Sequence, residues 1–257
     1  MKLKQTALAL PALLSLGLAA SLVPAAAQAE DAASPISYNV GVVSDYRYRG
    51  ISQSRLRPAL QGGVDYANGP IYLGTWLSTI KWIKDAGGGN APVEWDVYGG
   101  TKGELVKDTL SYDVGALGYI YLGNKYGDIA NSANANTAEI YTALTAYMFT
   151  AKYSYALTNL FGTGDSKGSG FLDVSANFDL GAGFTLTPEA GRQHVKGVNH
   201  AAASYNTYSL TLGKDFGKGL SGSIAFVGAN PDNGFYFTPD GRFTGRKGAV
   251  VGVKYAF

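Results

Sequence analysis

Charged side chains recur at alternate positions in several segments of the chain, a spacing that places them on one face of an extended strand. Asp45, Arg47 and Arg49 lie at the far end of one such segment, and Arg55 and Arg57 follow shortly after, so we predict that the four arginines form a basic patch near the mouth of the fold. A basic patch that faces an acidic wall sets up a transverse electric field, which orients polar solutes. The acids outnumber the bases in the full set of charged residues that we predict on the polar face: Asp45, Arg47, Arg49, Asp65, Glu94, Asp96, Asp113, Glu139, Lys152, Asp173, Asp179, Glu189 and Lys254.

Catalytic and metal chemistry find little support in the sequence. The chain has no cysteine, which excludes disulfide frameworks, thiolate metal sites and cysteine nucleophiles. Both histidines, His194 and His200, lie in or beside one connecting segment, and Ser204 and Ser209 are near them in sequence. A Ser-His arrangement also needs an orienting third group, and nothing in this segment marks one. We therefore expect solvated histidines, no catalytic residue, no metal site and no cofactor.

Alternation of apolar and polar residues is the dominant pattern of the chain, and no segment shows convincing helical spacing. From Ile36 to Arg49 the even positions are mostly apolar or aromatic and the odd positions mostly polar or charged. Several of these segments exceed the roughly 5 to 6 residues of a typical soluble strand and suit the roughly 9 to 11 residues that cross a bilayer at a tilt. We predict about twelve strands, near residues 36–49, 58–66, 71–80, 93–100, 109–122, 137–146, 150–157, 169–180, 184–193, 206–216, 220–229 and 246–257.

The connections between these strands alternate in length. Short connections fall at residues 67–70, 147–149, 181–183 and 217–219, with a somewhat longer one at 101–108. Long connections, rich in Gly, Asn, Ser and Asp, fall at 50–57, 81–92, 123–136, 158–168, 194–205 and 230–245. This sorting is typical of a membrane β-barrel with short periplasmic turns and longer extracellular loops, and a soluble sandwich has no reason to show it. The sequence therefore predicts an all-β, antiparallel, up-and-down transmembrane barrel.

The first 29 residues have the pattern of a secretory signal peptide. Lys2 and Lys4 precede a run of small apolar residues, and Ala27–Ala29 forms an A-x-A cleavage site. We predict cleavage after Ala29 and a barrel over residues 30–257, exported to the periplasm and inserted into a bacterial outer membrane. No later run approaches 18 apolar residues, which excludes a helical inner-membrane protein.

The overall composition agrees with a barrel that has one face in lipid. The two lysines of the signal peptide belong to the 21 basic residues, so the mature chain has 19 basic and 19 acidic residues. The mature chain therefore lacks the excess of basic residues that is typical of a nucleic-acid-binding protein. Mean hydropathy is −0.02 although aromatic residues make up 12% of the chain, as expected when apolar and polar faces alternate. We predict that the 18 tyrosines gather where lipid meets the headgroups.

The chain ends on a strand with a conspicuous aromatic terminus. Five residues share one face of this strand: Ala249, Val251, Val253, Tyr255 and Phe257. The pattern Gly252-x-x-Tyr255-x-Phe257 resembles the C-terminal signal that the bacterial barrel-assembly machinery reads. Val250 stands where that signal usually has a polar residue. We predict that this strand contacts the assembly machinery.

A longer resemblance begins at Ser44–Ser54, which reads SDYRYRGISQS, and continues from Pro58 to Asp65. These motifs resemble the opening signature of the TorF-type porins, a bacterial outer-membrane family also designated Gcw_chp. Shorter matches follow in order at Tyr72–Trp76, Glu94–Gly100, Tyr112–Gly115, Glu139–Tyr141 and Ala151–Tyr155. The resemblance implies an outer-membrane barrel with pore activity and supplies no substrate.

These observations lead us to expect a porin or channel for passive diffusion of small hydrophilic solutes through a charged lumen. The main alternative is that Arg47 and Arg49 pair with Asp65, Glu94 or Asp96 and plug a narrow barrel with a structural or surface-interaction role. An outer-membrane hydrolase is the weakest of the three hypotheses. The expected partners are outer-membrane lipids, lipopolysaccharide, the barrel-assembly machinery and small hydrophilic solutes.

Overall fold

The computed structural model describes residues 34–197, 199–232 and 234–257. The predicted signal peptide and its cleavage site lie outside the described residues. The wall of the fold consists of β1 (Ile36–Val43), β4 (Ala59–Asn68), β5 (Ile71–Thr79), β6 (Val93–Val106), β7 (Leu110–Ile120), β8 (Thr137–Ala146), β9 (Phe149–Ala156), β10 (Gly170–Ala176), β11 (Phe178–Gly181), β12 (Phe184–His194), β13 (Tyr205–Gly217), β14 (Leu220–Ala229) and β15 (Gly248–Ala256). Shorter elements lie between them: β2 (Arg47–Tyr48), β3 (Ile51–Ser52), α1 (Trp82–Asp85), a 3₁₀ turn (Tyr126–Asp128) and α2 (His200–Ala203).

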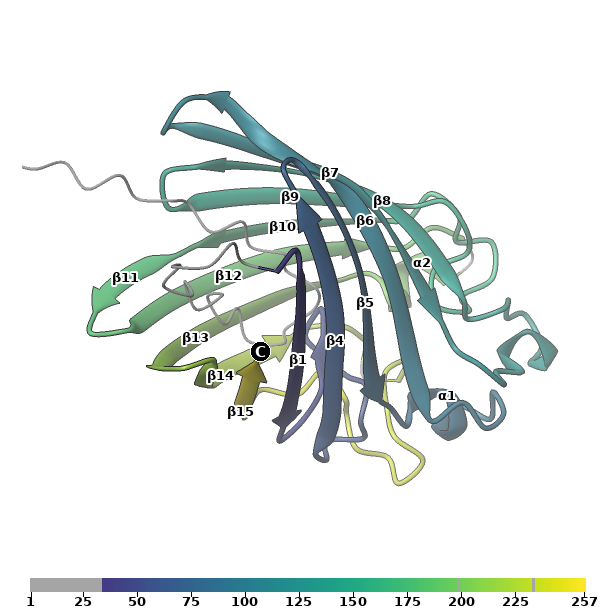
Figure 1. The fold of residues 1–257 in the computed structure, drawn as a ribbon. Helices are drawn as coiled ribbons and strands as arrows, with labels where there is room; N and C mark the ends of the chain where they lie inside the picture. Colours follow the sequence, from purple (N-terminus) through teal and green to yellow (C-terminus); the bar gives the residue numbers. More distant parts are fainter. Residues whose placement is uncertain (1–33, 198, 233) are drawn as a thin grey trace, which may run out of the picture.

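The wall is a closed barrel in which each strand pairs antiparallel with its neighbours along the chain (Figure 1). β10 and β11 are separated only by Asn177 and both pair with β12, so they act as one strand. Pairing of β1 with β15 closes the sheet. The predicted twelve-stranded up-and-down barrel is therefore confirmed. Closure pairs the two edge strands of the sheet. This is required in hydrocarbon because every backbone N–H and C=O group must form its hydrogen bond within the protein.

The closing seam joins the two ends of the described chain. Its register runs from Asn39 opposite Ala256 to Val43 opposite Gly252. Beyond it, Tyr38 and Phe257 exchange backbone hydrogen bonds of 2.9 and 3.0 Å. Both termini of the barrel thus lie at the end that carries the short turns.

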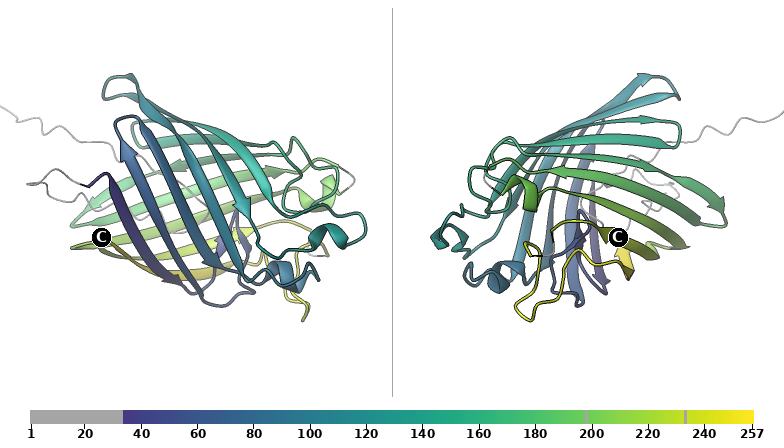
Figure 2. Two further views of the ribbon diagram at one scale, coloured as in Figure 1. Left: turned by 45° about the vertical axis from the view of Figure 1, so that its right-hand side comes forward. Right: turned by 180° about the vertical axis from the view of Figure 1, so that it is seen from behind.

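Connections at the two ends of the barrel differ in length, as the sequence predicts (Figure 2). One end has tight turns, and Tyr147, Ala182 and Lys218 adopt positive φ there, as two-residue hairpin turns require. The expected longer connection at 101–108 is wrong. β6 continues to Val106 and pairs with β7 as far as Leu110, with a bulge between Glu104 and Val106, so these backbone groups are bonded in the ladder. The other end carries six long segments, which we assign to the extracellular side.

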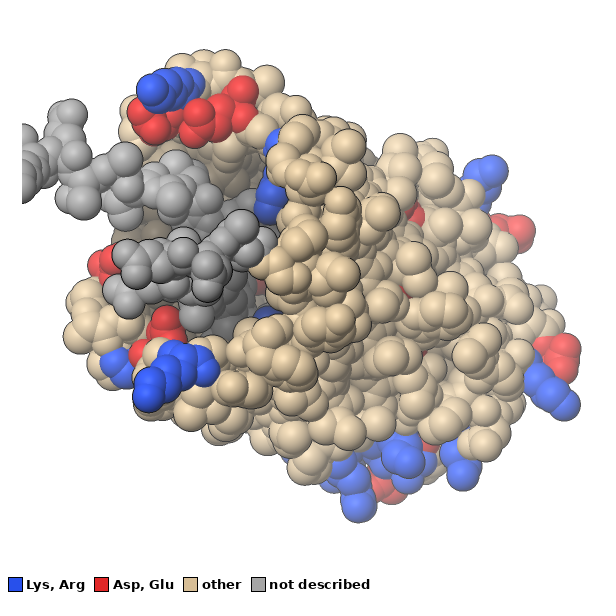
Figure 3. All heavy atoms as spheres, in the orientation of Figure 1, with Lys and Arg blue, Asp and Glu red and all other residues tan. Residues whose placement is uncertain are grey.

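Large apolar side chains point outward from every part of the wall and form a belt. Examples from strands around the barrel are Val40, Leu73, Val97, Val114, Ile140, Leu172, Leu210 and Val253, all exposed. On the face shown in Figure 3, charged residues gather toward the two ends with an uncharged band between them. Such a belt between charged ends is the surface of a barrel that sits in lipid.

No helix among the described residues is long and apolar enough to cross a membrane.

A charge placed in the belt should destabilise the barrel according to its depth. We expect Val114→Arg, near the middle of β7, to lower the free energy of unfolding in lipid vesicles by about 2 to 4 kcal/mol. Ile71→Arg, at the first residue of β5 beside a short turn, is the matched control and should cost about 0 to 1 kcal/mol. Both side chains are exposed and outward-facing. Urea unfolding followed by tryptophan fluorescence measures the difference, and equal losses would contradict a lipid-facing belt.

Candidate functional site

The first strand leaves the barrel wall earlier than predicted. β1 ends at Val43 instead of continuing to Arg49, because Ser44 ends the ladder with β15. The Ser44 amide donates to the Val251 carbonyl (2.8 Å), and the Val251 amide donates to the Ser44 hydroxyl instead of a backbone carbonyl (2.9 Å). The chain then turns into the barrel, where β2 and β3 form a small hairpin (Figure 2). We call residues 44–58 the plug.

Arg47 is buried inside the barrel and does not belong to a basic patch at the mouth. Its Nε donates to Asp45 Oδ2 (2.5 Å). One terminal nitrogen donates to the carbonyl oxygens of Gly50, Thr244 and Arg246 at 3.0, 2.9 and 3.1 Å. Arg47 therefore joins the plug to the long segment between β14 and β15.

Arg49 is also buried and joins the plug to the opposite side of the wall. It donates to Glu139 Oε2 on β8 (2.7 Å) and to Gln193 Oε1 on β12 (2.8 Å). Its guanidinium lies 4.5 Å from the centre of the Phe171 ring and 4.8 Å from that of Tyr48, close enough for cation–π attraction. Both arginines fold inward, as the plugged alternative expected.

The partners expected for these arginines are wrong. The described ion pairs of Arg47 and Arg49 are to Asp45 and Glu139, and neither involves Asp65, Glu94 or Asp96.

Tyrosine hydroxyls donate to two carboxylates around the plug, Glu94 and Glu139. Tyr46 and Tyr121 both donate to Glu94, the second at 2.6 Å. Tyr119 donates to Glu139 Oε2 at 3.1 Å, beside the Arg49 contact. These tyrosines are 2% exposed, so the carboxylates they contact are shielded from bulk water. These hydrogen bonds help to hold the buried plug, although Glu139 Oε1 has no hydrogen-bond partner among the described residues.

The same pairing recurs further from the plug. Tyr72 donates to Asp113 Oδ1 at 2.5 Å and also contacts the Tyr141 hydroxyl, and Tyr98 donates to Asp65 Oδ1 at 2.5 Å. The prediction that the tyrosines gather at the lipid boundary is therefore wrong for this group. The sequence did contain a signal for this inward orientation, because these tyrosines occupy the same alternate positions as the polar residues of their strands. A tyrosine that faces inward needs a partner for its hydroxyl.

Three other predicted residues, Asp96, Asp173 and Lys152, lie on the inner face. Asp96 and Asp173 are buried, and one oxygen of each has no hydrogen-bond partner among the described residues. The Lys152 ammonium lies 4.1 Å from the centre of the Tyr141 ring. Carboxylate oxygens without a hydrogen-bond partner inside a barrel can accept a hydrogen bond from water or bind a passing cation.

The last three predicted lining residues lie toward the short-turn end. Glu189 and Lys254 are half-buried and share the polar parity of their strands. Asp179 is exposed in β11, where its Oδ1 accepts a hydrogen bond from the Gly181 amide (2.8 Å). Asp179 thus lies at the periplasmic rim of the barrel.

The two remaining arginines of the predicted mouth patch do lie outside the barrel interior. Arg55 Nε donates to Asp85 Oδ2 of α1 (2.7 Å), and a second nitrogen contacts the other carboxylate oxygen. Arg57 is exposed. The cluster of four arginines is therefore split between a pair buried inside the barrel and an outer pair, of which Arg55 is neutralised by Asp85.

The histidines show no nucleophilic arrangement. His194 and His200 have ring centres 6.2 Å apart. Ser204 accepts a hydrogen bond from the Val195 amide at 2.9 Å, and no side-chain hydrogen bond among the described residues links either serine to a histidine. In the described part of the chain, no group of three His, Cys, Asp or Glu side chains is placed to hold a metal ion.

The C-terminal aromatics form a stack on the outer surface at the seam. The Phe257 ring lies 5.7 Å from those of Tyr255 and Tyr38. All three rings are exposed. Gly252 faces inward beside β14, where a β-carbon would come within 3.1 Å of the Ser223 hydroxyl. The role of these residues in assembly stays a prediction.

A protein-family model described as "Bacterial protein of unknown function (Gcw_chp)" matches residues 27–257. The chain belongs to the Gcw_chp family. This Gcw_chp barrel is similar in fold to the solved KdgM porin, with a TM-score of 0.52 and 11% identity over 86% of this chain and 98% of that chain. The NanC porin gives a TM-score of 0.51 at 11% identity with the same coverage. A KdgM porin solved in complex with disordered oligogalacturonate gives 0.51 at 10% identity, again over 86% and 98%.

At these identities the likeness shows a shared fold. No curated protein matches the sequence. With its apolar belt and porin-like barrel, the Gcw_chp chain is an outer-membrane β-barrel.

Proposed function

We propose that the chain is a channel for passive diffusion of small hydrophilic solutes across the outer membrane, through a charged lumen that the plug narrows, and that it is not an enzyme. The observation that carries this proposal is the plug itself. It is held inside a closed barrel by the contacts of Arg49 with Glu139 and Gln193 of the wall and by the hydrogen bond of Arg47 to Thr244 in the segment between β14 and β15. A segment folded into a barrel narrows the path, and the groups around it decide which solutes pass.

The wall around this path has two chemical sides. Carboxylates lie on β6, β7 and β8, including Glu94, Asp113 and Glu139. Buried hydroxyls line β12, β13 and β14: Thr187, Thr207, Ser209, Thr211 and Ser221. An acidic side opposite a neutral polar side gives a transverse field and favours cations over anions.

Cation preference is the measurable consequence of this lining. In planar bilayers under a KCl gradient, we expect a zero-current potential that reports K⁺ permeating faster than Cl⁻. Asp113→Asn should reduce this preference, because Asp113 faces the interior from β7 on the acidic side. Asp108→Asn, in the exposed turn after β6, is the matched control and should leave it unchanged. Absence of discrete conductance steps would refute the channel, and Cl⁻ preference would refute the acidic lining.

A structural or surface-interaction barrel is the second candidate, because the plug fills part of the interior with fully buried side chains such as Tyr46 and Arg47. Its outer segments would then contact lipopolysaccharide. Liposome swelling with sugars, amino acids and small anions separates the two. Uptake graded by solute size supports a general channel, uptake of one solute supports a specific channel, and no uptake supports the structural role.

We also propose that the barrel-assembly machinery recognises the C-terminal strand through Tyr255 and Phe257. Phe257→Ala should lower the amount of folded barrel in the outer membrane several-fold, because it removes the ring that ends the exposed stack. Tyr147→Ala, in the exposed β8–β9 turn, is a control of similar size change. Membrane fractionation with a heat-mobility assay measures folded barrel, and equal amounts in both variants would contradict this role.

A further inference from the structure

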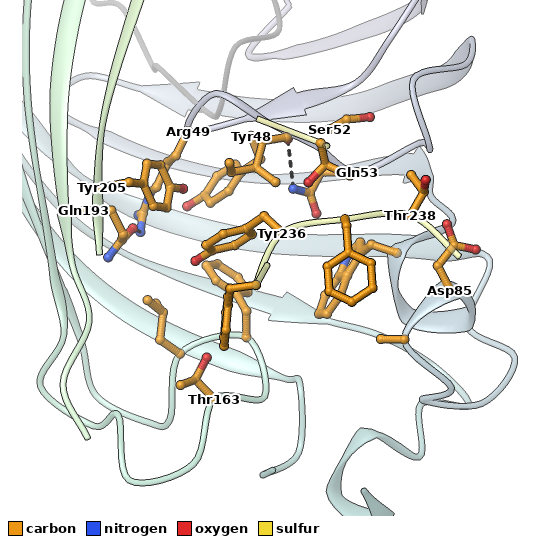
Figure 4. A pocket seen from close by; sticks show the side chains of 18 of the residues that line it. Tyr48, Arg49, Ser52, Gln53, Asp85, Thr163, Gln193, Tyr205, Tyr236 and Thr238 are labelled. Atoms are coloured by element: carbon orange, nitrogen blue, oxygen red, sulfur yellow. Dashed lines mark hydrogen bonds between the residues drawn. The ribbon is translucent and has the colours of Figure 1, made fainter. Parts of the chain in front are cut away.

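An aromatic pocket lies on the extracellular side of the plug. Its volume is about 160 Å³, and all six long segments or the strand ends beside them contribute to its lining (Figure 4). Two T-shaped or tilted ring pairs line it: Tyr205 with Tyr236 (5.4 Å between ring centres) and Trp82 with Tyr126 (5.5 Å). The pocket is smaller than the roughly 300 to 1,000 Å³ that hold drug-sized ligands. Its volume therefore suits one small ring.

The charged groups of this pocket are neutralised within the protein. Arg49 is paired with Glu139 and Gln193, and Arg55 is paired with Asp85. A charged ligand would compete with these pairs and would be desolvated without a free counter-charge. The pocket thus favours a neutral ligand.

The Tyr236 hydroxyl also stays neutral. It donates to the Ala203 carbonyl at 2.9 Å, and burial raises its pKa well above the usual value. Its ring is therefore held in a fixed place at the centre of the pocket (Figure 4).

Polar side chains lie at both ends of the aromatic lining. Figure 4 shows Gln193 at one end, Thr238 and Asp85 at the other, and Tyr236 between them. On the ring wall itself, Trp82 Nε1 has no hydrogen-bond partner among the described residues. Gln193, Thr238 and Asp85 already have partners within the protein. The described hydrogen bonds do not use three other lining groups, which are the Tyr205 hydroxyl, Gln53 Oε1 and the Thr163 hydroxyl, and a purely aromatic ligand would leave these groups desolvated without a partner. The lining suits a ring with apolar faces and a hydroxylated edge.

We propose that this pocket binds one neutral monosaccharide ring, whose faces contact the aromatic side chains and whose hydroxyls meet the hydroxyl and amide groups of Tyr205, Gln53 and Thr163. The proposal deepens the proposed function, since it names a solute class that the outer end of the channel would collect. It does not require conduction, because binding can be measured without a membrane. Failure of the channel and failure of the pocket are therefore distinguishable.

The experiment titrates the purified barrel in detergent micelles with D-glucose and follows tryptophan fluorescence. Trp82 lines the pocket, whereas Trp76 and Trp95 lie on β5 and β6. We expect a saturable change at millimolar glucose that is absent in Trp82→Phe. D-glucuronate and benzyl alcohol should bind much more weakly, the first because of its charge and the second because it has one hydroxyl.

Variants of Tyr236 separate ring contact from folding. Tyr236→Ala should weaken glucose binding about tenfold, the order expected for loss of one ring contact. Tyr236→Phe keeps the ring and should retain binding, and Tyr147→Ala in the distant turn is the matched control. Heat mobility shows that each barrel is folded. Absence of saturable glucose binding, equal binding of glucuronate or benzyl alcohol, or full binding by a folded Tyr236→Ala variant would each overturn the proposal.

Discussion

Replacing residues 44–58 with a loop of about four residues is expected to raise the single-channel conductance several-fold. Val43 and Ala59 already lie opposite each other in the β1–β4 ladder, and a hairpin of two to five residues joins such a pair without strain. The wall therefore keeps its register while the plug is removed. Water then fills the space that Tyr46, Arg47 and Arg49 occupy, and the narrowest part of the path widens.

Conductance in planar bilayers measures this change, and heat mobility confirms that the shortened barrel is folded. The wider path should also pass larger sugars in the liposome assay, which a change in surface charge alone would not produce. A folded variant with wild-type conductance would show that the plug does not limit the path.

Arg49→Met is expected to lower the free energy of unfolding by about 3 to 5 kcal/mol, because it leaves Glu139 as a buried charge without its partner. Both side chains of this pair are at most 6% exposed. The loosened plug should also make the open-channel current noisier. Arg49→Met combined with Glu139→Gln should recover much of the lost stability, since neither buried charge remains.

The outer ion pair supplies the matched control for this cycle. Arg55→Met removes the same type of side chain from Asp85, but a third of the Arg55 side chain is exposed. Water replaces the lost contact there, so the decrease in the free energy of unfolding should be much smaller than for Arg49→Met. Denaturant unfolding in micelles measures all three variants. Equal losses at Arg49 and Arg55 would contradict the view that burial makes the inner pair important.

Side-chain parity along the wall could be predicted from the sequence because each strand has one face in lipid. A one-residue error would place Glu94 or Glu139 in the apolar belt, so the pattern leaves only one register. The same argument could not find the end of β1. Alternation continues through Tyr46 and Tyr48, although the chain has already left the wall. The ladder ends through contacts of Ser44 with Val251, and sequence spacing does not reveal a partner 207 residues away.

The sequence also could not show which residues pair with the interior charges. Arg49 was predicted to face the interior, but its choice of Glu139 over Glu94 depends on how the plug turns at Arg49 and Gly50, both at positive φ. Tyr121 lies on the polar face of its segment, yet its contact with Glu94 exists only because β6 and β7 are adjacent. Periodicity predicts whether a side chain faces the lipid or the interior, but only the folded structure shows which residue it contacts there.

The contacts of Arg47 also constrain the order in which the protein folds. Its guanidinium bonds the carbonyl oxygens of Thr244 and Arg246, which lie 197 and 199 residues later in the chain. The segment that holds the plug therefore forms only when the end of the chain is present, directly before β15 pairs with β1. Contacts this distant in sequence form slowly. We expect the plug to enter an unfinished, open sheet and to become fixed in the last step, when the seam closes beside it.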